Sequence, residues 1–269
     1  MLAPLVLLPP SEGKAPDGNG PPWSDGKRSF GALDPARREV IAALRKAMRG
    51  DATRAAKLLG VGDAAAAAPI CANLIIDSAP TLPAIERYAG VLYDALDYPS
   101  LPAKVRRRVD EQVVVLSAVW GAVAPRDPIP DYKLKMGATL PRLGRLATWW
   151  RPTLTPVLDD LAAGRVVWNL LPGEHAAAWR TDHSAAAAMI SVRFLDEVER
   201  NGERQLVTVN HWNKLLKGAL VRHVLAQQLR EPDGLARFEH PQGYVYRPEL
   251  TAVVDDRIQV SMVAVRATR

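Results

Sequence analysis

The residues best suited to chemistry in this sequence are cations without acidic neighbours. No Asp or Glu occurs between positions 203 and 231, and this stretch holds Lys214, Lys217, Gly218 and Arg222. At 100° per residue these four fall within about 140° of one another on a helix, with apolar residues on the other side. Such a stripe favours an anion site, where Gly218 lets a ligand or backbone approach. A solvated amphipathic helix is the alternative.

Polar side chains also follow three apolar segments that predict buried strands, 5–8, 113–116 and 165–170. Ligand sites on α/β scaffolds are commonly built at strand ends. The candidate residues of an anion-binding cleft are Ser11, Lys14, Arg126, Lys133 and Asn169. Asp127 and Tyr132, in the same proline-stiffened loop as Arg126, are candidates for proton transfer. An ordinary loop with internal ion pairs is the alternative.

A third candidate site is a turn with two glycines. Gly60 and Gly62 separate two segments that predict helices, the second of them over 63–68. In a helix-hairpin-helix, such glycines let backbone amides approach a DNA phosphate. Arg54 and Lys57 would supply the accompanying charge. Two helices joined by a tight glycine turn, with no role in DNA binding, are the alternative.

The elements that must position these residues alternate between strands and helices. Helices are predicted from Asp34 to Gly50, over Pro80–Asp97, and over 213–229. An Asn-Gly turn at 201–202 predicts a hairpin of strands 190–195 and 205–210. We therefore expect one α/β domain of mixed α+β type over residues 1–269. Its central mixed sheet is flanked by helices, and a helix-hairpin-helix-like insertion covers about 51–69.

Bulk composition bounds the class of protein. The chain has 269 residues, 48% hydrophobic and 24% charged, which is typical of a folded globular protein. A net charge of +6 favours anionic partners such as nucleic acid or phosphorylated metabolites. The start of the chain lacks a basic region and reaches Pro9 too soon for a signal peptide or membrane span. We therefore expect a cytoplasmic protein without a membrane partner.

Metal and thiol chemistry are not predicted. The five histidines show no ligand spacing, and the single cysteine, Cys71, excludes a disulfide within the chain. We expect Cys71 to be a buried structural thiol because its neighbours are apolar. No metal and no cofactor are expected.

The segment Ser117–Gly137 carries a resemblance to a known family. SAVWGAVAPRDPIPDYKLKMG is similar to the pattern S-G-L-Y-G-x-x-x-P-x-D-x-I-x-x-Y-[RK]-L-x-x-G of the YaaA family of peroxide-stress proteins, with Ala118 and Trp120 as departures. LLPPSEGK, the segment around Asn169 and the K-x-x-[RK]-G-x-x-x-R pattern of 214–222 extend the similarity along the chain. The resemblance implies a helix-hairpin-helix-like element, binding of double-stranded DNA, and limitation of peroxide damage and free intracellular iron.

Two functions follow as hypotheses. The first is non-specific binding of double-stranded DNA through its phosphates; the residues expected to make the contacts are Arg54, Lys57, Gly60, Gly62, Lys133, Lys214, Lys217 and Arg222. The second is an enzyme that acts on a small anionic metabolite in a Lys/Arg-lined cleft, with Lys14, Lys214 and Lys217 binding the anion. An enclosed pocket would favour the enzyme, and an open groove would favour DNA.

Overall fold

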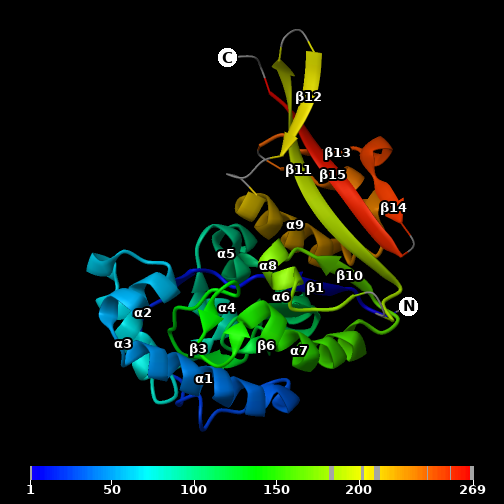
Figure 1. Cartoon of the computed structure of the whole chain (residues 1–269). Helices are drawn as coiled ribbons and strands as arrows, with labels where there is room; N and C mark the ends of the chain where they lie inside the picture. Colours follow the sequence, from blue (N-terminus) through cyan, green and yellow to red (C-terminus); the bar gives the residue numbers. More distant parts are fainter. Residues whose placement is uncertain are drawn as a thin grey trace.

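The computed structural model describes residues 2–181, 185–200, 203–208, 213–240, 242–254 and 256–266. Strands of one large sheet run through this part of the chain (Figure 1). They are β1 (Leu5–Leu8), β5 (Val113–Ser117), β6 (Gly121–Val123), β10 (Val166–Asn169), β11 (Ala188–Arg200), β12 (Glu203–Thr208), β13 (Val245–Tyr246), β14 (Ala252–Val254) and β15 (Arg257–Val265). Their order is β13-β15-β11-β10-β1-β5-β6, with β12 beside β11 and β14 beside β15.

The middle of this sheet is parallel and its edges are antiparallel. β1 pairs in parallel with β5 and β10, and β10 pairs in parallel with β11. β5 and β6 form an antiparallel pair at one edge, and β13 and β14 pair antiparallel with β15 at the other. Every residue of β1 and β5 is buried, as expected for strands covered on both faces. The predicted mixed sheet is confirmed.

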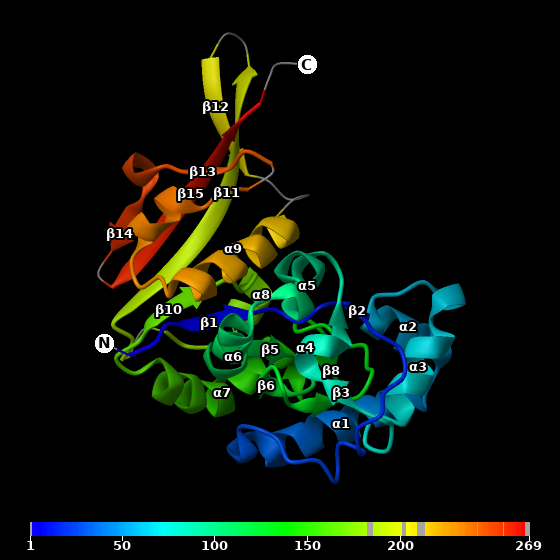
Figure 2. The ribbon, with the colours of Figure 1, turned by 180° about the vertical axis from the view of Figure 1, so that it is seen from behind.

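Helices flank the sheet (Figures 1 and 2). They are α1 (Asp34–Met48), α2 (Ala52–Leu59), α3 (Ala67–Leu74), α4 (Ala84–Arg87), α5 (Val91–Leu96), α6 (Ala103–Gln112), α7 (Leu146–Ala162), α8 (Gly173–Ala176) and α9 (Asn213–Gln227). Short two-residue strands form three further pairs: β2 (Gly13–Lys14) with β4 (Tyr88–Ala89), β3 (Leu82–Pro83) with β7 (Pro128–Ile129), and β8 (Thr139–Leu140) with β9 (Gly144–Arg145). None of the helices within the described ranges is long and apolar enough to cross a membrane.

The prediction of one helix over Pro80–Asp97 is wrong. The chain there forms α4, then β4, then α5. Tyr88 pairs with Lys14 in the β2–β4 ladder, and Gly90 has a φ of +119°, which a helix does not contain. A tertiary strand pairing therefore overrides the helical periodicity, and it fixes Lys14 beside Tyr88.

The segment after Gly62 also differs from its prediction. A 3-10 turn covers Asp63–Ala65, and α3 then runs from Ala67 through Pro69 to Leu74. Pro69 is tolerated because it lies in the first turn of α3, where its missing N–H would have no helical partner. In this register α3 buries Asn73 and exposes Cys71, so the prediction of a buried thiol is wrong.

A long hairpin of β11 and β12 projects from the sheet on the side away from α1 (Figure 1). The two strands pair antiparallel, with Arg200 opposite Glu203. This confirms the predicted hairpin, while its Asn201-Gly202 turn and residues 209–210 lie outside the described residues.

Candidate anion site

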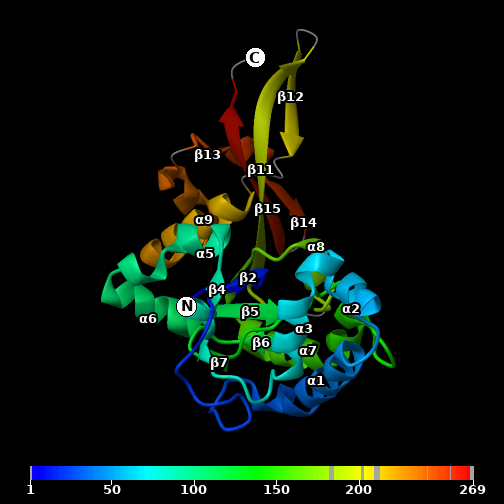
Figure 3. The ribbon, with the colours of Figure 1, turned by 90° about the vertical axis from the view of Figure 1, so that its left-hand side faces the viewer.

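A cavity of about 590 Å³ lies where β2, β4, α5, α8 and α9 meet; we call it the inner cavity. Figure 3 looks toward these elements, with β2 and β4 between α5 and α9 on one side and α8 on the other. The polar residues that line it are Ser11, Glu12, Lys14, Tyr93, Tyr132, Lys133, Lys135, Glu174, His175, Asn213, Lys214 and Lys217. Five lysines against two glutamates make its walls cationic.

Lys14 is a half-buried lysine on this wall. Its Nζ donates to the Ser11 carbonyl at 3.1 Å and lies 4.1 Å from the centroid of the Tyr132 ring. Burial lowers the pKa of Lys14 to about 8, although the carboxylate of Asp131 acts in the opposite direction. Within the described part of the chain, no carboxylate forms an ion pair with Lys14. A substantial fraction of this amine is therefore neutral near pH 8.

The Tyr132 hydroxyl belongs to a buried hydrogen-bond network. It lies 2.7 Å from the Ser117 hydroxyl and 2.9 Å from the Tyr88 hydroxyl. Burial raises the pKa of Tyr132 to about 12. Tyr132 therefore remains a neutral phenol, and its hydroxyl holds the ring that supports Lys14.

His175 contributes a polar atom without a protein partner. Only 6% of the residue is exposed, and its Nδ1 is buried with no hydrogen bond. Glu174 lies 3.8 Å from this nitrogen. Burial lowers the pKa of His175 to about 4, so the imidazole is neutral at physiological pH. The imidazole therefore adds a neutral side chain to the cavity wall, while its Nδ1 is covered by the protein.

The other cavity lysines have different partners. Lys133 forms an ion pair with Glu12 at 2.9 Å, and Lys135 lies 3.8 Å from the same carboxylate. Lys217 donates to the Leu170 carbonyl at 2.9 Å, and burial lowers its pKa. Lys214 is exposed at the cavity mouth. These groups place positive charge around the cavity, and Lys133 is the one held most directly by a carboxylate.

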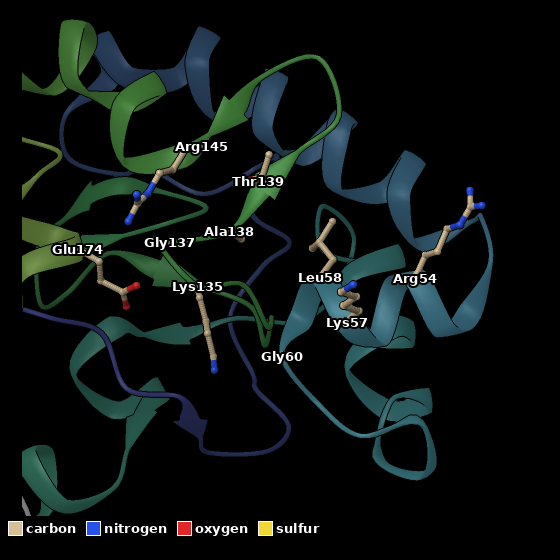
Figure 4. A pocket seen from close by; sticks show the side chains of 10 residues that line it. All are labelled: Arg54, Lys57, Leu58, Gly60, Lys135, Gly137, Ala138, Thr139, Arg145 and Glu174. Carbon is tan, nitrogen blue, oxygen red and sulfur yellow. The ribbon is translucent and has the colours of Figure 1, made fainter.

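A second, more open hollow of about 570 Å³ adjoins the inner cavity; we call it the outer hollow (Figure 4). It is lined by Arg54, Lys57, Leu58, Gly60, Lys135, Gly137, Ala138, Thr139, Arg145 and Glu174. In Figure 4 the α2 residues lie across the hollow from Lys135, Arg145 and Glu174. Lys135 and Glu174 line both spaces.

Gly60 connects the glycine turn to the site. It ends α2 with a φ of +67°, and a Cβ placed on it would lie 2.9 Å from Lys135 Nζ. Its backbone N–H is bound to carbonyls at the end of α2. The absent side chain at Gly60 therefore makes room for the Lys135 ammonium between the two spaces.

Several predicted site residues lie outside both spaces. Arg126 pairs with Glu86, and Asp127 accepts hydrogen bonds from the Ser29 and Ala124 amides. The remaining residues of this group are Gly62, Asn169, Gly218 and Arg222.

Two of these residues have clear roles in packing. Arg222 donates to the carbonyls of Leu96 and Asp97 at the end of α5. A Cβ on Gly218 would lie 2.1 Å from the Leu92 carbonyl oxygen, so Gly218 lets α9 approach the backbone of α5.

Several site residues were not among the sequence candidates, among them Lys135, Arg145, Glu174 and His175. The sequence signal for the last two is their place directly after β10, at the same strand end that made Asn169 a candidate. Asn169 itself lines neither space, and its side-chain oxygen accepts from the Leu171 amide.

The comparisons with known proteins cover most of the chain. The family model described as peroxide stress protein YaaA matches residues 5–250. A UPF0246 protein of Streptomyces coelicolor is 40% identical over 222 residues, which is 82% of this chain and 83% of the relative. A UPF0246 protein of Corynebacterium glutamicum is 36% identical over 231 residues, with 84% and 86% covered. These matches confirm the resemblance carried by Ser117–Gly137, and the chain belongs to the peroxide stress protein YaaA family.

Proposed function

We propose that this protein binds double-stranded DNA through its phosphate backbone, without sequence preference, in the outer hollow. The observation that carries the proposal is the charge of that hollow, which is lined by the cations Arg54, Lys57, Lys135 and Arg145 and by the carboxylate of Glu174. An open basic surface attracts polyanions by releasing their counterions. Side chains of this kind position a backbone and do not read bases.

The segment around the glycine turn supports this proposal through the charged side chains of α2 and not through the backbone amides of the turn. Gly60 and Val61 donate their amides to carbonyls of α2, so these two N–H groups are already bound. Arg54 and Lys57 project from α2 beside the turn and line the hollow. Helix α2 and the glycine turn would thus hold these two cations against the phosphates.

The proposal also gives a physical link to iron-driven damage. Divalent cations gather at DNA phosphates, and a protein that neutralises phosphates releases them. Ferrous ions displaced in this way would generate hydroxyl radicals from peroxide away from the bases. The protein would therefore limit oxidative damage to the DNA that it covers.

The test measures the affinity for a duplex of arbitrary sequence as a function of salt. The affinity should fall steeply with log salt and vary little between sequences. The double variant Lys57→Ala/Arg145→Ala should reduce the slope by about 2, since each phosphate contact contributes about 0.9. Arg126→Ala removes one cation outside both spaces, where Arg126 pairs with Glu86, and should leave the slope unchanged.

Two results would contradict this proposal. One is no binding of duplex at low salt. The other is a double variant that binds like Arg126→Ala. The link to iron-driven damage is tested with a plasmid exposed to ferrous iron and peroxide. Wild-type protein should reduce nicking of the plasmid more than the double variant does.

A second candidate function is supported by the enclosure of the inner cavity. Its cationic walls hold Lys14, Tyr132 and His175, and its volume of about 590 Å³ suits a small ligand. We infer that this cavity accepts a small anionic group, such as a phosphorylated metabolite. Binding of inorganic phosphate to the protein, measured in the absence of DNA, tests this inference.

A further inference from the structure

We propose that Lys14 is an amine nucleophile that forms an imine with a phosphate-bearing aldehyde in the inner cavity. This assignment deepens the second candidate function, because it names the substrate class and the reacting atom. It does not depend on duplex binding in the outer hollow.

Lys14 differs from the other four cavity lysines in what holds its amine. Lys133 and Lys135 share the Glu12 carboxylate, and Lys214 is exposed at the mouth. Lys217 and Lys14 each donate to one backbone carbonyl, of Leu170 and of Ser11. What sets Lys14 apart is that its Nζ also lies over the buried Tyr132 ring.

The setting of Lys14 suits nucleophilic attack. Only a neutral amine has the lone pair that attacks a carbonyl carbon, and burial lowers the pKa of Lys14 to about 8. The neutral form is therefore present at physiological pH without a dedicated base. The β2–β4 ladder fixes the backbone of Lys14 beside Tyr88, which holds the side chain against the wall of the cavity.

The reaction requires no oxidant or metal. The Lys14 lone pair forms a C–N bond to the aldehyde carbon while the C=O π bond breaks, which gives a carbinolamine after one proton moves from nitrogen to oxygen. Loss of water then forms the C=N bond. The remaining N–H proton of the carbinolamine leaves with its hydroxyl group in that water, so the step balances without a further reactant.

The remaining lysines account for the phosphate on the aldehyde. Lys133, Lys135, Lys214 and Lys217 line the cavity that contains Lys14, and a phosphate with nearly two negative charges would pair with several of them. The charge of Lys133 also favours the neutral amine at Lys14, because it lowers the pKa of Lys14.

A phosphorylated aldehyde has two possible sources. One is a free sugar phosphate, and the other is the open sugar of an abasic site in DNA. Lys135 and Glu174 line both the cavity and the outer hollow, so a damaged sugar and its flanking phosphates would occupy adjoining spaces. The two sources present the same aldehyde chemistry to Lys14.

The experiment traps the imine by reduction. Wild-type protein is incubated with glyceraldehyde 3-phosphate and cyanoborohydride, and modified lysines are identified by peptide mass spectrometry. Lys14 should be modified at least tenfold faster than the exposed Lys104, and inorganic phosphate should slow the reaction at Lys14 alone. The rate at Lys14 should rise with pH and level off above about pH 8.

Two controls separate nucleophilicity from binding. Lys14→Arg keeps the charge and should abolish the fast reaction while inorganic phosphate still binds. Glyceraldehyde without phosphate should react at Lys14 at least tenfold more slowly than its phosphorylated form. A duplex with one abasic site, compared with an intact duplex, shows whether the aldehyde can come from DNA, because only the former should be cross-linked.

Equal modification of Lys14 and Lys104 would overturn the proposal, as would a fast reaction that persists in Lys14→Arg. If inorganic phosphate binds and Lys14 is not preferentially modified, the nucleophile assignment fails while the anion cavity stands. If inorganic phosphate does not bind at all, the second candidate function fails with it.

Discussion

The Lys14 ammonium lies 4.1 Å from the centroid of the Tyr132 ring, whose hydroxyl is fixed by Ser117 and Tyr88. A cation over an aromatic face gains roughly 0.5–2 kcal/mol. Burial acts against the charged form and lowers the pKa of Lys14. The fold therefore keeps an amine where its charge is disfavoured, as expected where function and stability compete.

Replacing Lys14 should stabilise the protein near neutral pH. The pKa of Lys14 falls from 10.5 to about 8 on folding, so the protonated form is penalised fully below pH 8 and not at all above about 10.5. Lys14→Met removes this penalty and should raise the free energy of unfolding at pH 7 by about 1–2 kcal/mol, because partial exposure screens the charge. Urea denaturation at pH 7 and pH 10.5 measures the difference in unfolding free energy between variant and wild type. An equal stabilisation at both pH values would contradict the assignment of the penalty to the charge of Lys14.

His175 should make the wild-type protein sensitive to acid. Its pKa falls from 6.5 to about 4 on folding, so stability is present above pH 6.5 and is lost as the pH falls toward 4. The loss amounts to roughly 3 kcal/mol. The phenylalanine of His175→Phe cannot titrate. As the pH falls from 6.5 toward 4, the free energy of unfolding of the wild type should therefore decrease relative to that of the variant. A difference that is constant from pH 7.5 to pH 4 would exclude this cause.

Gly218 should be irreplaceable for a reason of packing. An alanine Cβ there would lie 2.1 Å from the Leu92 carbonyl oxygen, a contact with backbone that cannot move aside. Gly218→Ala should lower stability by more than about 3 kcal/mol, although alanine favours helices by about 1 kcal/mol. Gly62→Ala is the matched control, because no atom lies within 4 Å of its Cβ and its φ is −70°. Thermal unfolding compares the two, and similar melting temperatures would contradict this role.

Asp127 should affect stability and leave the site unchanged. Its two carboxylate oxygens accept from the amides of Ser29 and Ala124, at 2.7 and 2.8 Å. Asn cannot accept at both positions, so Asp127→Asn should cost about 1–3 kcal/mol of stability. Phosphate binding and the trapping reaction at Lys14 should be unaffected at a temperature where the variant is folded. Loss of either would return Asp127 to the list of proton-transfer candidates.

The strands of the sheet were predictable because their signal is local. The apolar runs over 5–8 and 113–116 are short for a helix and continuous enough for a strand covered on both faces, and both form buried strands. The pairing of Tyr88 with Lys14 was not predictable, because it joins segments 74 residues apart and overrides a helical pattern. The helical periodicity of 80–97 is real but belongs to two short helices.

The sequence predicted those residues of the candidate site that are recognisable from the chain itself, by a positive charge or by a position at the end of a strand. Ser11, Lys14, Lys133, Lys214 and Lys217 meet in one cavity. Arg222 lies on the same helix as the last two, yet its guanidinium caps the end of α5. Residue spacing predicts which face of a helix a side chain occupies, but it does not predict which neighbouring element that face contacts. His175 escaped notice because its unpartnered nitrogen is a property of the packed structure.

Lys135 and Glu174 have a further consequence because each lines two spaces. An anion in the inner cavity and a duplex along the outer hollow would both draw on the same ammonium, and so would not bind independently. Thermodynamic linkage requires that each change the affinity of the other by the same factor. Competition for Lys135 would make the two proposed ligands antagonists, whereas a single molecule that spans both spaces would gain from the two together.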